Sequence, residues 1–396
     1  MGAGVKGDKR YDFDTVVDRT GTASEKWDRY AGRDVIPLWV ADMDFRSPPA
    51  VIDVLHARVD HGVFGYTSPP RELVETVISS LARDYSWNLD PAWIVWLPGL
   101  VTGLNVACRS VGYHDDEVLT FTPVYPPFLS APRLSGRTAV TVPLWLSGGR
   151  WLMDMEELER AVTPRSRLFL LCNPHNPVGR AWTREELEKV AEFAERHDLI
   201  ICSDEIHAGL ILDEGVHHIP LAALSQAVAR RTITLHAPSK TYNIPGLGCS
   251  FAVIADDGLR ALFKRTMAGI VPHVNLLGYT AAQAAYRHGE AWRRELVAYL
   301  RGNRDLVAAE IGRMPGLAMT HVEATYLAWI DARQPGFPQP VRFFEEAGVG
   351  LSDGAYFGLP GFVRLNFGCP RALLTEALAR MAGALERCRD LRNCQG

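Results

Sequence analysis

The sequence predicts an α/β protein in which a mostly parallel sheet lies between two layers of helices, followed by a smaller α+β unit. Three observations predict this fold. The chain has 396 residues, of which 47% are hydrophobic and 22% charged, enough to bury a large core. Short apolar runs alternate with helical stretches between residues 93 and 255. These runs are continuously apolar, which is typical of parallel strands buried on both faces.

The apolar runs are the expected strands of the central sheet. They lie at residues 94–97, 117–121, 168–172, 199–203, 231–236 and 251–254. Between the third and fourth runs, Thr183 precedes Glu185, Glu186 and a periodic stretch that reaches His197, the pattern of a capped amphipathic helix. Residues 168–204 therefore predict one βαβ unit.

The two ends of the chain predict different structures. A long helix is expected over residues 292–314, strands at 325–330 and 363–367, and a final helix from Ala372. Residues up to about 45 are rich in charge and aromatics without a strong period, which indicates an arm. We expect an N-terminal arm and part of the small domain at residues 1–50, a large domain at 51–290 and a C-terminal small domain at 291–396.

Composition excludes several classes of function. Lys and Arg number 42 against 46 Asp and Glu, without a basic block, which disfavours nucleic acid as a partner. Seven cysteines without a CxxC pair or metal-ligand spacing indicate reduced thiols and no metal site. No apolar run reaches the ~18 residues of a membrane span, and the first residues lack a signal-peptide core. We therefore expect a cytoplasmic protein without a membrane partner.

Four of the expected strands end in unusual segments, at residues 98–102, 173–179, 204–207 and 238–240. In an open α/β sheet, ligands bind beyond the carboxyl ends of the strands. Each segment alone has an ordinary structural explanation, since Pro-Gly turns open helices, Asp caps them, and a lysine is usually solvated. The four segments together, in this order along the chain, favour a ligand site.

This ordered series resembles the fold-type I pyridoxal phosphate enzymes, and within them the cystathionine β-lyase or PatB/MalY-like carbon–sulfur lyases. The resemblance spans nearly the whole chain and rests on residues 13–14, 26–28, 38–45, 61–67, 172–180, 204–207, 239–243 and 363–368. It implies the aspartate-aminotransferase-like form of the α/β fold, pyridoxal 5′-phosphate as cofactor, a small amino-acid substrate, and a homodimer with shared active sites.

The resemblance also implies catalytic roles. Lys240 would bind the cofactor aldehyde covalently and, once freed by substrate, move the α-proton as a general base. Asp204 would keep the pyridine nitrogen protonated, so that the ring can accept electrons. Asn176 would donate to the cofactor phenolate oxygen and border the substrate, while Tyr125 would stack on the ring. The planar guanidinium group of Arg364 would bind the substrate α-carboxylate with two hydrogen bonds, a geometry that lysine cannot supply.

Phosphate binding is expected at the start of a helix. Gly99, Leu100 and Val101 follow a strand directly, so their free backbone amides suit an anion, and Ser239 would add a hydroxyl. Tyr66 resembles the tyrosine that in relatives reaches the phosphate from the neighbouring subunit and borders the substrate.

The remaining candidates lie around these groups. His207 either touches the cofactor or caps the next helix, and Trp39 and Tyr356 are expected along the substrate pocket. Two positions depart from the family pattern: Ala237 replaces a phosphate-binding Ser or Thr, and Gly248 replaces an Arg common in aminotransferases. The second departure favours the lyase branch.

The resemblance leaves three functions open. The first is β-elimination from an L-cysteine S-conjugate such as cystathionine, releasing a thiol, pyruvate and ammonia. The second is an aminotransferase that uses the same residues. The third is a cofactor-binding regulatory protein, which the presence of both Lys240 and Asp204 disfavours.

Overall fold

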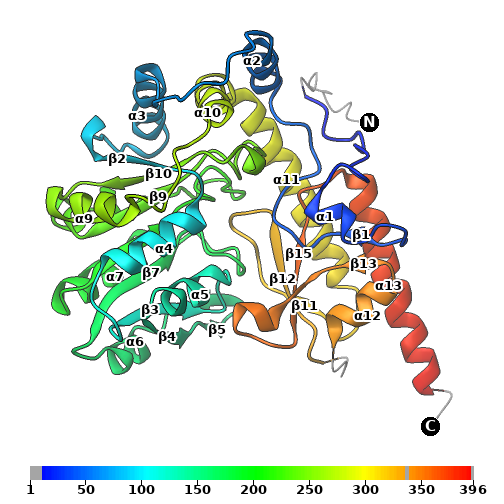
Figure 1. Cartoon of the computed structure of the whole chain (residues 1–396). Helices are drawn as coiled ribbons and strands as arrows, with labels where there is room; N and C mark the ends of the chain where they lie inside the picture. The colour runs from blue at the N-terminus through cyan, green and yellow to red at the C-terminus, as the bar shows by residue number, and fades with distance from the viewer. Residues whose placement is uncertain (1–10, 335–338, 394–396) are drawn as a thin grey trace.

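The computed structural model describes residues 11–334 and 339–393. Within these residues, seven strands form one helix-flanked sheet and four strands form a smaller sheet beside the C-terminal helices (Figure 1). The predicted α/β class is confirmed. Two separate clusters of apolar side chains bury the two faces of the large sheet, and a chain of this composition supplies enough apolar residues for both.

The large sheet has the strand order β2-β10-β9-β8-β7-β3-β4. All neighbours in it run parallel except β10, which is antiparallel to both β2 and β9. The strands are β2 (Ile94–Leu97), β3 (Glu117–Thr122), β4 (Thr138–Pro143), β7 (Ser166–Cys172), β8 (Ile200–Asp204), β9 (Thr232–His236) and β10 (Ser250–Ile254). The six expected strands are confirmed. The edge strand β4 was not predicted, because it is largely exposed and lacks a continuous apolar run.

Helices cover both faces of this sheet. α4 (Leu100–Ser110), α5 (Pro127–Leu134) and α9 (Asp257–Met267) pack on one face, and α6 (Met155–Ala161) and α7 (Arg184–Arg196) on the other. The predicted start of α7 is confirmed as a capping box, in which Thr183 and Glu186 each accept the other's backbone N–H. α2 (Pro49–Asp60) and α3 (Arg71–Tyr85) pack against α10 (Leu276–His288). Shorter elements are η1 (Pro91–Trp93), the hairpin β5 (Trp145–Ser147) and β6 (Arg150–Leu152), η2 (Leu221–Ala223), α8 (Gln226–Arg230) and η3 (Pro245–Leu247).

The C-terminal part contains the smaller sheet, in the order β11-β12-β15-β14. Its elements are α11 (Glu290–Ile311), β11 (Ala318–Met319), β12 (Leu327–Asp331), α12 (Pro340–Glu346), β13 (Val349–Gly350), β14 (Ser352–Asp353), η4 (Gly354–Phe357), β15 (Phe362–Asn366) and α13 (Arg371–Asn393). The strand expected from residue 325 begins only at Leu327. Thr325 has a φ of 76°, in the left-handed region, which a β-strand does not accept.

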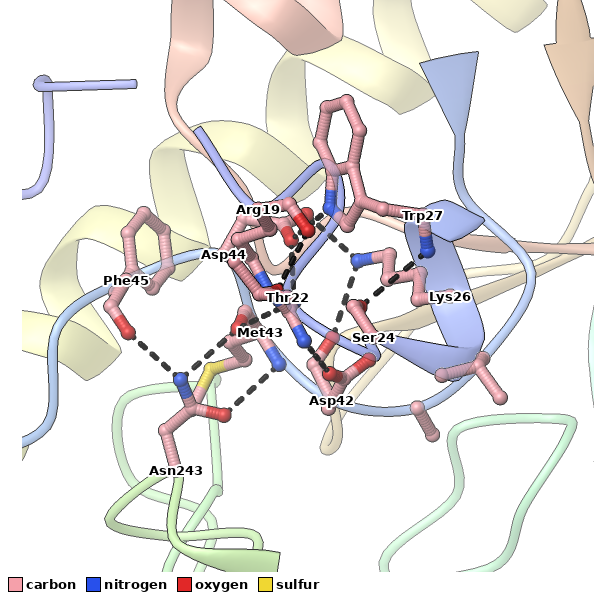
Figure 2. Close-up of polar contacts among 12 residues, drawn as sticks. Arg19, Thr22, Ser24, Lys26, Trp27, Asp42, Met43, Asp44, Phe45 and Asn243 are labelled. Atoms are coloured by element: carbon pink, nitrogen blue, oxygen red, sulfur yellow. Dashed lines mark hydrogen bonds and ion pairs between the residues drawn. The ribbon is translucent and has the colours of Figure 1, made fainter. Parts of the chain in front are cut away.

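The N-terminal segment crosses between the two sheets. After α1 (Glu25–Asp28), β1 (Ile36–Pro37) pairs in parallel with β13. Residues 38–45, which follow, are here called the strap. Side chains from the large-sheet part and from the small-sheet part of the chain hold it. Asn366 donates to the carbonyls of Val40 and Asp42, and Asn243 donates to those of Met43 and Phe45, as Figure 2 shows for Asn243. The strap buries Leu38, Met43 and Phe45, but these follow no helix or strand period, because hydrogen bonds to other segments fix its irregular backbone.

No helix in the described part of the chain has the length and hydrophobicity that crossing a bilayer requires.

Candidate active site

A cavity of about 440 Å³ lies at the carboxyl ends of β2, β7, β8 and β9. Most of the predicted site residues line it: Gly99, Leu100, Val101, Tyr125, Asn176, Asp204, His207, Ser239, Lys240 and Arg364. They come from six separate segments of the chain. The expectation that parallel strand ends gather these polar groups is met by the geometry.

Three predicted residues do not line this cavity. The side chain of Tyr66 is fully exposed and that of Tyr356 is mostly exposed. Trp39 turns its ring toward the guanidinium of Arg29, 4.5 Å from the ring centroid, and its indole N–H donates to the carbonyl of Lys26. Within a single chain, these three side chains therefore form no part of the cavity wall.

Lys240 lies in the turn that follows β9. Its Nζ donates a hydrogen bond of 2.6 Å to the carbonyl of Ala41 in the strap. Burial lowers the pKa of Lys240 to about 8, while the negative charges of Asp42 and Asp204 oppose this decrease. A lysine with such a pKa supplies a substantial fraction of neutral amine near neutral pH, which a nucleophile or general base needs.

Asp204 is the last residue of β8, and its Oδ1 accepts the backbone N–H of Ile206 at 3.1 Å. Burial raises the pKa of Asp204 to about 7, and the neighbouring Glu205 raises it further, although Lys240 opposes the increase. Among the described residues, no side chain donates a hydrogen bond to this carboxylate. A buried carboxyl of this kind fits a ligand that presents a cationic N–H.

Arg364 reaches the cavity from β15. Its Nη1 donates to Oδ1 of Asn176 at 3.0 Å, and its Nη2 donates to the carbonyl of Trp39 at 2.9 Å. The buried Nε has no partner among the residues that the structure describes. Burial lowers the pKa of Arg364 to about 10, so the group remains a cation at neutral pH. A buried cation with an unused N–H fits a carboxylate ligand.

Asn176 and Tyr125 are brought together by a backbone hydrogen bond, from the Tyr125 N–H to the Asn176 carbonyl at 3.0 Å. Since Oδ1 of Asn176 already accepts from Arg364, its Nδ2 remains the group that can donate to a ligand oxygen. Burial raises the pKa of Tyr125, so its hydroxyl stays neutral. Both side chains suit an aromatic ligand with an anionic oxygen.

The start of α4 forms the anion end of the cavity. Gly99 is its N-cap and provides no side-chain cap, so the first backbone N–H groups are left for a ligand. A Cβ placed on Gly99 would meet no atom within 4 Å, so the space beside this helix start is open. Ser239 lines the same cavity. These donors fit a phosphate.

Gly248 also lines the cavity, and its backbone explains the departure noted from the sequence. It has a φ of 57°, and a Cβ there would lie 3.2 Å from the carbonyl oxygen of Pro98. A side chain at this position is therefore disfavoured by both backbone conformation and space. Ala237 is buried next to the site and does not line it.

The alternative role of His207 as a helix cap is wrong, because residues 206–209 form turns rather than the start of a helix. His207 is buried in the cavity wall, with its ring 6.0 Å from that of Tyr326. Burial lowers the pKa of His207 to about 3, and Lys240 lowers it further. The imidazole is therefore neutral.

Sequence reasoning missed the contribution of the strap and α1 to the cavity. Glu25, Lys26, Ala41 and Asp42 line it beside the predicted residues. Ala41 acts through its backbone carbonyl, a group that every residue carries, so no residue type could have marked it. The charges of Lys26 and Asp42 were visible in the sequence, but only the fold places them beside Lys240.

Comparison with known proteins gives one family. The model for aminotransferases of class I and II matches residues 33–381. Cystathionine β-lyase PatB of Bacillus subtilis (strain 168) is 38% identical over 385 residues, covering 94% of this chain and 99% of that protein.

Solved structures agree with this result. The crystal structure of OvoB superposes with a TM-score of 0.93 and 48% identity, covering 95% of this chain and 99% of OvoB. Cystalysin from Treponema denticola, solved with its pyridoxal 5′-phosphate cofactor, gives a TM-score of 0.92 and 32% identity, covering 95% and 99% of the two chains. The likeness extends over the whole length of these relatives.

Proposed function

Because this chain belongs to the aminotransferase class I and II family, we propose that it is a pyridoxal 5′-phosphate-dependent carbon–sulfur β-lyase. Its substrates are L-cysteine S-conjugates such as L-cystathionine. The net reaction takes up one water and releases a thiol, pyruvate and an ammonium ion. The observation that carries the proposal is the convergence of Lys240, Asp204 and Arg364 in one cavity.

The residues present fit the cofactor. The first amides of α4 and Ser239 would hold the phosphate, and Asp204 would hold the ring nitrogen. The Nδ2 of Asn176 would donate to the ring oxygen, while Tyr125 packs beside the ring. Lys240 would hold pyridoxal phosphate before substrate binds, and once the substrate amine has replaced and freed this lysine, the cofactor would supply an electron sink for negative charge at the substrate α-carbon.

The chain itself positions the substrate and moves its proton. Arg364 binds the α-carboxylate, which fixes the α-carbon relative to Lys240. The neutral amine of Lys240 takes the α-proton, so the C–H bond breaks and an N–H bond forms. The electron pair left on the substrate then expels the sulfur from the β-carbon. The sulfur leaves as a thiolate and takes up a proton, and the remaining aminoacrylate reacts with water to give pyruvate and ammonia.

The proposal includes a homodimer. The segment around Tyr66 exposes Val63, Phe64 and Tyr66, with 61%, 60% and 109% of each residue's surface accessible. Three adjacent exposed apolar side chains favour a surface that a second copy covers. In that arrangement Tyr66 would reach the phosphate of the partner's site.

The decisive test is incubation of the purified protein with L-cystathionine, without any keto acid. We expect pyruvate and free thiol in equal amounts. Pyruvate that forms only with an added keto-acid acceptor, and without thiol, would overturn the lyase and favour an aminotransferase. Lys240→Ala should abolish the reaction, whereas Lys189→Ala, which removes an exposed lysine on α7, serves as the matched control.

A further inference from the structure

We propose that Asp42 is a positioning residue for Lys240, and that its carboxylate is the counter-ion of the ammonium group that Lys240 carries after it takes the substrate proton. This inference rests on the proposed function, since it concerns the same proton transfer. It adds one residue of the strap to the active-site residues that lie at the strand ends.

The first observation is the way in which the strap meets Lys240. The carbonyl of Ala41 accepts the Nζ of Lys240 at 2.6 Å and the hydroxyl of Tyr326 at 2.7 Å. Asp42 is the next residue and lines the same cavity. The hydrogen bond from Tyr326 fixes the carbonyl, so the lysine amine is held at the residue directly before Asp42.

The second observation is an unused carboxylate oxygen. Oδ2 of Asp42 forms an ion pair of 2.5 Å with Arg19, whereas Oδ1 is buried and has no hydrogen-bond partner within the described residues. A buried acceptor without a partner is unfavourable unless a positive charge lies nearby. The ammonium form of Lys240 supplies that charge at the moment of proton transfer.

Electrostatics supports this pairing. Among the charges around Lys240, Asp42 opposes the burial-induced decrease of the Lys240 pKa most strongly. The same carboxylate also adds to the rise in the pKa of Tyr326 that burial causes. The charge of Asp42 therefore acts on both donors that meet at the Ala41 carbonyl.

A network of buried charges holds Asp42 in place (Figure 2). Arg19 bridges Asp42 and Asp44, with its Nη1 2.6 Å from Oδ1 of Asp44. Asp44 also accepts Lys26 Nζ at 2.6 Å and Trp27 Nε1 at 2.8 Å. Because Lys26 and Asp44 are almost fully buried, the network fixes the carboxylate of Asp42 before substrate binds.

The other groups around Lys240 cannot take this role. Asp204 is committed to the cofactor ring nitrogen in the proposed function. Arg364 is a cation and lowers the pKa of Lys240, and His207 is neutral. Glu25 lines the cavity but is exposed, and Lys26 is paired with Asp44. Asp42 is the negative charge that remains.

Asp42→Asn tests the inference with a defined geometry. Arg19 can only donate, so it will bind the amide oxygen, and the amide NH₂ will occupy the place of Oδ1. We first measure the pH dependence of the rate at which the full-length apoenzyme takes up pyridoxal phosphate, which requires a neutral Lys240. The midpoint should move down by about one pH unit, a tenfold loss of proton affinity. Asp42→Glu should lie closer to the unsubstituted protein.

The holoenzyme gives the second measurement. In Asp42→Asn, kcat with a cysteine S-conjugate should fall about tenfold, with a smaller change in KM and a larger kinetic isotope effect from deuterium at the α-carbon. Glu25→Gln removes another carboxylate from the same cavity wall and is the matched control, with no shift of the midpoint. An equal midpoint in Asp42→Asn and Glu25→Gln would overturn the inference.

Two further outcomes are informative. Should Asp42→Asn fail to fold, Arg19→Gln removes the compensating cation, and the midpoint must then move upward; an unchanged midpoint overturns the inference. A shifted midpoint in a protein that releases no pyruvate from any conjugate would support the role of Asp42 and reject the lyase function. A protein that takes up no pyridoxal phosphate would reject both.

Discussion

Nη1 of Arg364 donates a hydrogen bond of 3.0 Å to Oδ1 of Asn176, and this contact joins β15 of the smaller sheet to the segment that follows β7 of the large sheet. The residue expected to bind the substrate carboxylate thus orients the residue expected to bind the cofactor oxygen. One hydrogen bond therefore couples the proposed substrate contact to the proposed cofactor contact.

The first prediction concerns the guanidinium group of Arg364. Arg364→Lys keeps the charge but removes Nε and the second Nη, so it cannot hold Asn176 and a carboxylate together. We expect kcat/KM for an L-cysteine S-conjugate to fall by a factor of 30 to 1,000, equivalent to about 2 to 4 kcal/mol. Steady-state kinetics of pyruvate release provide the measurement.

The control for this prediction is Arg342→Lys, an exposed arginine on α12 paired with Glu346. Its kcat/KM should match that of the unsubstituted protein. If Arg364→Lys retained full kcat/KM, the role of Arg364 in carboxylate binding would be wrong.

The second prediction concerns the shared active site. Tyr66→Ala and Lys240→Ala should each lose most of their activity, but for different reasons, because in the proposed dimer Tyr66 serves the partner's site. Random mixing of the two variants should restore about a quarter of the normal activity, since half the dimers then contain one complete site. Mixing either variant with itself is the control. No recovery in a mixture that exchanges subunits would mean that Tyr66 does not reach the partner's site.

The third prediction concerns the buried ion pair between Lys26 and Asp44 of the strap. Asp44→Asn leaves Lys26 buried without its counter-ion, which should lower the free energy of unfolding by about 3 to 5 kcal/mol. Adding Lys26→Met should recover part of this loss, because the unpaired charge is then removed. Urea unfolding measures both values. Glu188→Gln, in an exposed pair with Arg184, should change the free energy of unfolding by less than about 0.5 kcal/mol.

The fourth prediction concerns acid stability of the apoenzyme. Burial lowers the pKa of His175 to about 4 and those of His207 and His236 to about 3. In the unfolded chain these histidines have pKa values near 6.5 and bind protons at a pH where the folded chain keeps them neutral. Their contribution to the free energy of unfolding is therefore complete above pH 6.5 and is lost as the pH falls. The raised pKa of Asp204, about 7, acts in the opposite sense, because the folded state then holds a proton that the unfolded state releases.

Between pH 4 and 6 the unfolded chain therefore binds about two more protons than the folded chain. The free energy of unfolding then falls by about 3 kcal/mol for each unit by which the pH decreases. Denaturant unfolding at pH 6.0, 5.5 and 5.0 measures this slope. His236→Gln should reduce it by about one proton, even if the variant is less stable at neutral pH. A stability that does not change across this range would contradict the buried neutral state of these histidines.

Six of the seven strands of the large sheet and most of the cavity lining could be predicted from the amino-acid sequence. Strands buried on both faces must be continuously apolar, so β7, β8 and β9 were visible as runs. Parallel strands end at one edge, so Asp204 and Lys240 could be placed together before their contacts were known. The resemblance supplied roles for these residues, and the cavity brings them to one place.

The remaining features depend on how distant segments of the chain pack together. The edge strand β4 carries no continuous apolar run, and β12 begins only after Thr325, whose backbone is left-handed. Neighbouring chain segments rather than local propensity determine these two features. The contact between Lys240 and Ala41 uses a backbone carbonyl, and the free oxygen of Asp42 depends on Arg19, far from Lys240 in sequence. Residue types show which groups a chain carries, but distances between groups on distant segments exist only once the segments are packed.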